Sequence, residues 1–254
     1  MQVRTSTGRH RQARVRHAEV SVIKVNQIQS AAQALRLAPR IDMAGVCVGD
    51  EADAHCIGVD VARAIHDALP GLPLSVALPG WAALQPGQVD RLLQDIGASH
   101  FEFTPVDLAK PADFAAELLR LQAIRAPKIA NGFFLQHDDL SFASDLAPYH
   151  ALQQAGVVWF QFEIGSAVAL GVCLSQPDLQ RVQSFLAGLP VLATDQITAL
   201  GGYPLSTVSN FFFNLGLPRA QRNYDFGQLA WAESQLMKLL PQRAAKTWAT
   251  PTSG

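Results

Sequence analysis

Short apolar runs and amphipathic helical stretches alternate along most of this chain. The segment from Val59 to Leu69 shows helical spacing, with apolar side chains at Val61, Ala64 and Ile65. The short apolar runs have the length and composition of buried β-strands. We expect eight such strands, at Val20–Val25, Met43–Val48, Leu74–Leu78, His100–Phe103, Lys128–Leu135, Val157–Ile164, Pro190–Ala193 and Phe211–Phe213.

A helix is expected after each of these strands except the seventh. Pro86 and Pro111 stand where two of these helices begin, and Gly97 and Gly156 follow the ends of two. The predicted helices are Ala31–Leu37, Val59–Leu69, Gln88–Ile96, Ala112–Ile124, Asp145–Ala155, Pro177–Ala187 and Phe226–Leu240.

This repeated order predicts an α/β fold, a (βα)8 TIM barrel that forms a single domain over residues 19–242. An open, doubly wound sheet is the competing architecture. Such a sheet usually has a glycine-rich loop after its first strand, and residues 25–28 contain no glycine. The barrel is therefore favoured.

Composition limits the class of protein further. The 254 residues are 49% hydrophobic and 16% charged, which excludes a disordered chain and allows a core that needs no disulfide or metal. No apolar run is long enough to span a membrane. Cys47, Cys56 and Cys173 form no CxxC pair, which indicates a reducing, cytoplasmic compartment and no structural zinc. No cofactor is expected.

Charge is distributed unevenly along the chain. Residues 1–17 hold five of the 20 Lys and Arg residues and no acid, so we interpret residues 1–18 as a disordered basic extension and residues 243–254 as a tail. The remainder carries 15 basic against 21 acidic residues, a net charge of −6 that would repel nucleic acid phosphates. The expected partner is a small-molecule substrate or ligand, with no nucleic acid and no membrane. The oligomeric state stays open.

The carboxyl ends of the strands are the expected place of an active site in such a barrel. Glu163 ends an apolar strand, where burial would raise its pKa towards the range of a general acid. The alternative is a solvated carboxylate in a salt bridge. Lys24 and Lys128 are candidate anion contacts or electrophiles, and a buried Lys128 needs a partner, for which Glu102 is the candidate. Alternatively, both lysines form structural ion pairs inside the barrel.

Three further features have weaker chemical interpretations. His137 and Asp138 follow the fifth strand and could contact a substrate, but adjacent side chains point apart, so a polar loop without metal is favoured. His55 and Cys56 are neighbours and for the same reason are not expected to form a catalytic pair. The run Phe211–Phe213 is interpreted as a strand with alternate rings inside and outside the barrel.

A phosphate site would use the loops after the seventh and eighth strands. Thr194 and Asp195 follow the seventh strand, and the Asp195 carboxylate would repel a phosphate. Asn214 and Gly216 follow the eighth, where Gly216 allows a close approach of the backbone. The sequence evidence for a phosphate-binding site is therefore weak.

Taken in order, these strand ends resemble phosphoribosylanthranilate isomerase, a (βα)8-barrel enzyme of tryptophan biosynthesis. The similar segments match the family's strand motifs loosely and cover about residues 20–240. They are Ile23–Asn26 (V-K-I-C in the family), Ala44–Val48 (G-F-V-F), Phe101–Phe103 (L-Q-L-H-G), Pro127–Ala130 (I-K-A-I), Phe160–Glu163 (L-L-L-D), Val191–Ala193 (I-L-A-G-G) and Asn214–Leu217 (S-S-G-V).

The resemblance implies an Amadori rearrangement by one general base and one general acid. The position of the base is Asn26 here, which cannot take a proton, whereas Glu163 can replace the acidic aspartate. His55 falls where the family has a substrate-contacting arginine, and Thr194 and Asp195 fall where it has phosphate-binding glycines. Asn26 would instead orient a substrate by hydrogen bonds.

Three hypotheses for function follow. The first is a divergent isomerase or lyase that acts on a small polar metabolite, phosphorylated sugars included, by general acid–base chemistry with Glu163. The second is a non-catalytic barrel with a binding or regulatory role. The third is an unrelated barrel lyase or aldolase in which Lys128 forms a Schiff base.

Overall fold

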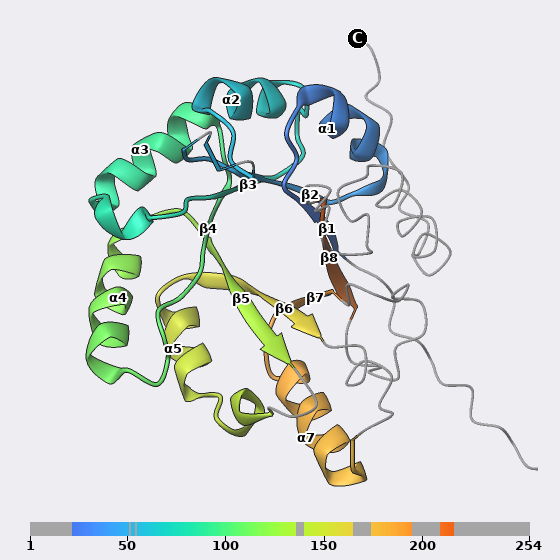
Figure 1. The fold of residues 1–254 in the computed structure, drawn as a ribbon, viewed down its shortest axis with the longest axis vertical. Coiled ribbons are helices and arrows are strands. Elements are labelled where there is room, and N and C mark those ends of the chain that lie inside the picture. The colour runs from blue at the N-terminus through green and yellow to red at the C-terminus, as the bar shows by residue number, and fades with distance from the viewer. Residues whose placement is uncertain are drawn as a thin grey trace, which may run out of the picture.

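Eight parallel strands form a closed barrel in chain order (Figure 1). The computed structural model describes residues 22–50, 52–53, 55–135, 140–164, 174–194 and 209–215. The strands are β1 (Val22–Asn26), β2 (Met43–Cys47), β3 (Leu74–Ala77), β4 (His100–Phe103), β5 (Lys128–Leu135), β6 (Val157–Ile164), β7 (Val191–Thr194) and β8 (Asn210–Asn214). β8 pairs with β1 and closes the ring. The single-domain TIM barrel predicted from the sequence is confirmed.

The described helices lie on the outside of the barrel (Figure 1). They are α1 (Ala31–Leu37), α2 (Val59–Asp67), α3 (Pro86–Ile96), α4 (Pro111–Ala123), α5 (Ala147–Gln154) and α7 (Gln176–Ala187), with short 3-10 turns η1 (Ala38–Arg40), η2 (Trp81–Ala83) and η3 (Ser141–Ser144). None of the helices in the described ranges has the length and apolar character that crossing a membrane requires.

Local sequence signals account for the ends of several helices. Pro86 and Pro111 occupy the first helical positions of α3 and α4, and Gly97 ends α3 in the left-handed conformation. Ser175 caps α7 by accepting a hydrogen bond from the backbone of Asp178. The expected helix at 226–240 and the segments 1–18 and 243–254 lie outside the described residues.

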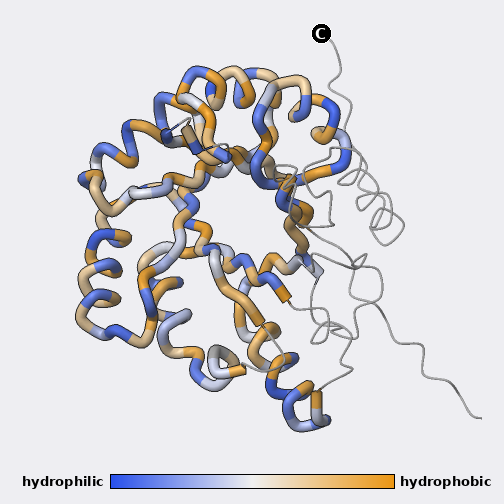
Figure 2. The backbone as a smooth tube through the Cα atoms, in the orientation of Figure 1, coloured by the Kyte–Doolittle hydropathy of each residue, from blue (hydrophilic) through white to orange (hydrophobic). Residues whose placement is uncertain are grey.

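The apolar core lies between the strands and the helices. Along each strand successive side chains point to opposite faces, so one set faces the helices and the other the barrel interior. Tyr149 of α5 packs its ring against Phe160 and Phe162 of β6, with centroid distances of 5.5 and 6.0 Å. The colouring in Figure 2 shows apolar and polar residues interspersed along both the strands and the helices. The helix-facing positions supply the hydrophobic core, which leaves the inward-facing positions for other side chains.

Tyr149→Phe is expected to raise the free energy of unfolding by about 1 kcal/mol. The Tyr149 ring is 1% exposed, and its hydroxyl has no hydrogen-bond partner among the described residues. Because burying an unpaired hydroxyl costs free energy, its removal should stabilise the fold. Urea denaturation of the two proteins measures the difference. Tyr149→Leu, which also removes the ring, should be destabilised, and a loss of stability in Tyr149→Phe would contradict the prediction.

Candidate functional site

A buried ion pair lies at the centre of the barrel. The Nζ of Lys24 on β1 is 2.5 Å from Oε2 of Glu102 on β4, and both side chains are almost fully buried. Burial lowers the pKa of Lys24, against the opposing effect of the Glu102 carboxylate. Burial alone would raise the pKa of Glu102, but Lys24 and the neighbouring donors outweigh it, so this pKa lies below its ordinary value. The 2.5 Å contact between the ammonium and the carboxylate is that of a buried ion pair.

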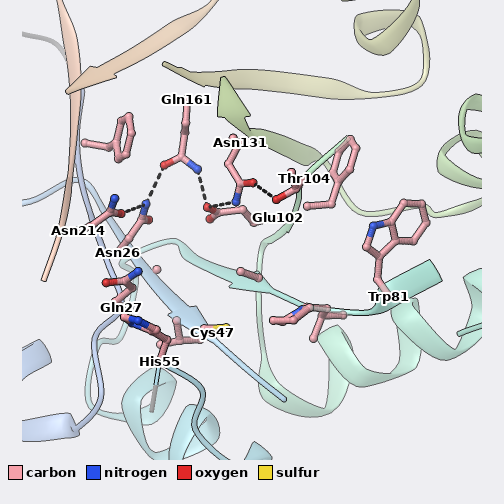
Figure 3. Close-up of a pocket in the computed structure, with 18 of the residues that line it drawn as sticks. Asn26, Gln27, Cys47, His55, Trp81, Glu102, Thr104, Asn131, Gln161 and Asn214 are labelled. Atoms are coloured by element: carbon pink, nitrogen blue, oxygen red, sulfur yellow. Dashed lines mark hydrogen bonds between the residues drawn. The ribbon is translucent and has the colours of Figure 1, made fainter. Parts of the chain in front are cut away.

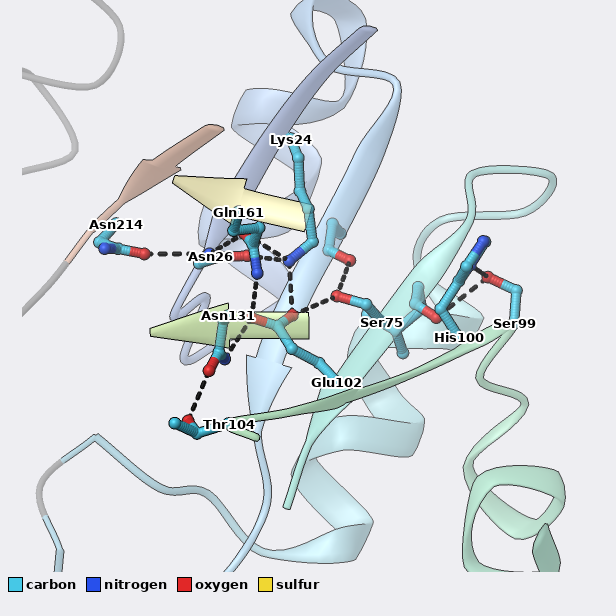
Figure 4. A network of polar contacts seen from close by, with 12 residues as sticks. Lys24, Asn26, Ser75, Ser99, His100, Glu102, Thr104, Asn131, Gln161 and Asn214 are labelled. Carbon is cyan, nitrogen blue, oxygen red and sulfur yellow. Dashed lines mark hydrogen bonds and ion pairs between the residues drawn. The ribbon is translucent and has the colours of Figure 1, made fainter. Parts of the chain in front are cut away.

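Glu102 also accepts hydrogen bonds from three other strands. Ser75 Oγ on β3 donates to Oε2 at 3.1 Å. Asn131 Nδ2 on β5 and Gln161 Nε2 on β6 donate to Oε1 at 3.0 and 2.5 Å. The carboxylate thus joins five strands of the barrel and fixes the orientation of two amides (Figure 4).

The network continues from Lys24 through Asn26. Lys24 Nζ donates to Asn26 Oδ1, and Asn26 Nδ2 donates to Gln161 Oε1 at 2.9 Å and to Asn214 Oδ1 at 3.0 Å. Asn26 therefore has a fixed side-chain orientation, set by hydrogen bonds to β1, β6 and β8.

Glycine at position 45 of β2 makes room for this network. Gly45→Ala is expected to lower the free energy of unfolding by about 1–3 kcal/mol. A Cβ there would lie 2.5 Å from Asn26 Oδ1 and 3.2 Å from Lys24 Nζ, and neither atom can move without losing partners. Gly87→Ala in α3, where nothing lies within 4 Å, is the control. Chemical denaturation that gave equal stabilities for the two variants would contradict the prediction.

A cavity of about 430 Å³ opens above the network, at the carboxyl ends of the strands (Figure 3). One part of its wall is apolar and includes Leu78, Pro79 and Trp81. Most of the polar lining groups are neutral or form part of the network. The polar lining residues are Asn26, Gln27, Cys47, His55, Glu102, Thr104, Asn131, Gln161, Glu163 and Asn214.

The structure brings together four of the residues that the sequence singled out. Asn26, Glu102, Glu163 and Asn214 come from β1, β4, β6 and β8 and line this one cavity. Glu163 and Gln161 are two residues apart on β6 and so face the same side of the sheet. His55 also lines the cavity.

Other candidates lie elsewhere or outside the described residues. Lys24 is fully buried below the cavity and does not line it. Thr194 is also buried; it pairs with Glu163 in the β6–β7 ladder but does not line the cavity. His137, Asp138, Asp195 and Gly216 lie outside the described residues.

The expected pairing of Lys128 with Glu102 is wrong. Lys128 is the first residue of β5, so it lies at the end of the barrel opposite the cavity. Its Nζ donates to the backbone carbonyls of Ile124 and Ala126 at 2.7 and 3.0 Å. The reason is register, because Lys128 aligns with Phe101 while Glu102 aligns with Ile129. The structure therefore gives Lys128 no place in the cavity from which it could form a Schiff base with a bound carbonyl compound.

Sequence reasoning missed several polar residues of the site, among them Thr104, Asn131 and Gln161. Thr104 donates to Asn131 Oδ1 at 2.5 Å, so it extends the network to the cavity wall. A signal was present, since Gln161 stands two residues before Glu163 inside an apolar strand. Polar side chains at every second position of a buried strand indicate that the strand faces a polar barrel interior.

The bulge in β5 has a role in placing Asn131. The register between β5 and β6 shifts between Ala130 and Phe133, and Gly132 adopts a φ of 82°, which favours glycine. A Cβ at Gly132 would lie 2.8 Å from Thr104 Cγ2. The bulge lets β5 direct the Asn131 amide to Glu102 while Phe133 packs in the core.

The charges of the cavity define which chemistry it can support. No lysine or arginine is among the described residues that line it, and Glu102 is neutralised by Lys24. In the part of the chain that the structure describes, no three His, Cys, Asp or Glu side chains cluster in a way that could hold a metal ion. The described part of the lining thus offers amide groups and the Glu163 carboxylate to a bound ligand.

Known proteins resemble this chain in architecture. Its sequence matches no known protein family and no curated protein. Solved phosphoribosylanthranilate isomerases have the same fold. The enzyme from Pyrococcus furiosus superposes with a TM-score of 0.57 at 12% identity, over 87% of this chain and 98% of that one. The enzyme from Thermus thermophilus gives 0.56 at 14% identity, over 88% and 100%.

A third isomerase, from Thermococcus kodakaraensis, gives a TM-score of 0.54 at 11% identity, over 88% of this chain and 98% of that one. Identities this low show a shared (βα)8 barrel, and one barrel fold carries many different activities. The resemblance expected from the strand ends therefore holds for the fold.

Proposed function

We propose that this protein is an isomerase-like enzyme that moves a proton on a small, uncharged polar metabolite, such as a hydroxy aldehyde or hydroxy ketone. The observation that carries the proposal is the position of Glu163. It is one of the two carboxylates among the described lining residues, the other being Glu102, which pairs with Lys24. It shares β6 with Gln161, whose amide the Lys24–Glu102 pair orients. A pre-oriented polar site next to one acid–base group is what proton transfer requires.

Glu163 would take a proton from the hydroxyl-bearing carbon next to the carbonyl group and return it to the carbonyl carbon, while the hydroxyl proton passes to the former carbonyl oxygen. The negative charge that develops on the substrate oxygen needs a hydrogen-bond donor. The Nδ2 group of Asn214 suits this role, because it lines the cavity and has no partner among the described residues. The apolar wall at Trp81 would exclude water from the opposite side of the substrate.

A single carboxylate must serve as both base and acid in this reaction. The resemblance to the isomerases implies a base at Asn26, but the Asn26 amide accepts from Lys24 and donates to Gln161 and Asn214. Its role is to position groups and not to transfer protons. The substrate is accordingly expected to differ from that of the isomerases, and the absence of cationic side chains among the described lining residues favours an unphosphorylated one.

Because Asn26 cannot take a proton, a second candidate function is a barrel that binds a small molecule without converting it. Such a barrel retains the cavity and the amide network but lacks the base that the resemblance implies. The two candidates share a ligand class and differ in whether Glu163 transfers a proton.

Proton exchange with solvent distinguishes the candidates. The protein is incubated in D2O with a panel of hydroxy aldehydes and hydroxy ketones, each with and without a phosphate group, and NMR follows deuterium incorporation. Thermal shift on the same panel measures binding. Exchange with an unphosphorylated compound supports the enzyme, and binding without exchange supports the second candidate. An absence of binding across the panel contradicts both.

A further inference from the structure

Two thiols meet at the rim of the cavity. Cys47 is the last residue of β2 and lines the cavity, whereas Cys56 is buried and precedes α2. Their Sγ atoms are 3.0 Å apart, and the sequence separates them by nine positions. The acid–base function proposed for Glu163 uses neither thiol.

The backbone holds the two cysteines side by side. Ile57 N–H donates to Cys47 O at 2.8 Å, and Val48 and Ile57 form a parallel bridge. Neighbouring backbones in such a ladder are about 4.8 Å apart, which lies within the range of Cα separations that a disulfide spans. Gly49 leaves space beside Cys56, because a Cβ at that position would lie 3.2 Å from its Sγ.

We propose that Cys47 and Cys56 form a reversible disulfide by exchange with a low-molecular-weight disulfide, such as glutathione disulfide, that enters the cavity. The Cys47 thiolate attacks one sulfur of glutathione disulfide, which breaks that S–S bond and releases one glutathione thiolate. Cys56 then attacks Cys47 Sγ in the mixed disulfide and releases the second glutathione. The protein loses two electrons and two protons, and both end on the two glutathione molecules.

The order of these steps follows from access. Cys47 faces the cavity, so a small disulfide can reach it, whereas Cys56 is 8% exposed and serves as the resolving thiol. Burial raises the pKa of Cys47, and Cys56 and the carboxylates of Asp53 and Glu102 raise it further. The first step is therefore slow at neutral pH, and the second is fast because the two sulfurs are already adjacent.

The disulfide would change the wall of the cavity. The segment between the two cysteines carries His55, whose backbone N–H is bonded to Asp53 Oδ1 at 3.0 Å. A covalent link between β2 and Cys56 would replace a thiol that lines the cavity and would tie His55 to the barrel. The site would then respond to the thiol–disulfide balance around the protein.

Mass spectrometry of the folded full-length chain tests the proposal. Cys173→Ser serves as the background and matched control, because it removes the cysteine outside the pair. After treatment with glutathione disulfide, this variant should lose the mass of two hydrogen atoms, and digestion should yield a peptide that joins positions 47 and 56. Dithiothreitol should restore the reduced mass. A stable glutathione adduct without an internal disulfide would overturn the proposal.

Two further variants test the order of attack. Cys56→Ser in the same background should retain one glutathionyl group, on Cys47. Cys47→Ser should stay unmodified, because the buried Cys56 is out of reach. Modification of Cys56 in Cys47→Ser at a rate equal to that of Cys47 would contradict the assigned roles. Peptide mapping of the native chain requires no variant, and a link from position 47 or 56 to Cys173 would also overturn the proposal.

Discussion

Lys24→Met should lower the free energy of unfolding by about 3–5 kcal/mol, the cost of leaving one charge of a buried ion pair without its partner. Glu102 would keep its donors Ser75, Asn131 and Gln161 but would lose the one cation within 4 Å of it among the described residues. Methionine fills most of the volume of the lysine side chain, so the loss in unfolding free energy comes mainly from the removed charge. Urea denaturation at neutral pH measures it.

The double variant Lys24→Met/Glu102→Gln separates the charge from the packing. Glutamine can still accept from Asn131 and Gln161, and no ionised group remains at the centre of the barrel. We expect the double variant to be more stable than Lys24→Met alone, because removing both charges avoids the uncompensated desolvation. Glu102→Gln alone completes the comparison. If the losses in unfolding free energy of Lys24→Met and Glu102→Gln simply add in the double variant, the two charges are not coupled and the prediction fails.

The pH dependence of Lys24→Met has a defined sign. In the native protein the pKa of Glu102 is lowered, so its stabilising contribution is present above the ordinary carboxyl pKa and is lost as pH falls through the lowered value. In Lys24→Met the lowering effect of the lysine is lost, so we expect burial to raise the pKa of Glu102 above its value in the native protein. The destabilisation of Lys24→Met should therefore be smaller at about pH 5 than at about pH 8. An equal loss at both pH values would contradict this account.

Glu163→Gln should lower the rate of substrate proton exchange by about 10²- to 10⁴-fold, the usual contribution of a general acid–base group. Glutamine preserves the shape and the hydrogen-bonding capacity of the side chain but cannot take a proton. Ligand affinity, measured by thermal shift or calorimetry, should change little, since the amides of the cavity hold the ligand. The NMR exchange assay in D2O gives the rate.

Glu117→Gln is the matched control for this variant. Glu117 lies on α4 and accepts a hydrogen bond from the backbone of Val106 at 3.1 Å, away from the cavity lining. The same chemical change at this position should leave exchange unaltered. If Glu163→Gln and Glu117→Gln exchange at equal rates while both bind ligand, Glu163 is not the proton-transfer group.

The sequence determined much of the fold because its signals are local. The apolar period along each strand and helix, and residues such as Pro86 and Gly97 at helix ends, depend only on near neighbours. These signals placed all eight strands to within a few residues. They also placed Asn26, Glu163 and Asn214 at carboxyl ends of strands, which in a parallel barrel meet at one face.

The partners of the buried charges were decided by the tertiary structure. Lys24 and Glu102 are 78 positions apart, and only the closure of the barrel and its register bring them together. A shift of one residue in the β4–β5 register separates Glu102 from Lys128, which alternation along each strand cannot reveal. The same applies to Gln161 and Asn131, whose roles come from the carboxylate they share. The sequence by itself therefore specified where the strands and their carboxyl ends lie, and the stagger of strands around the closed barrel specified which side chains face inward and which of them touch.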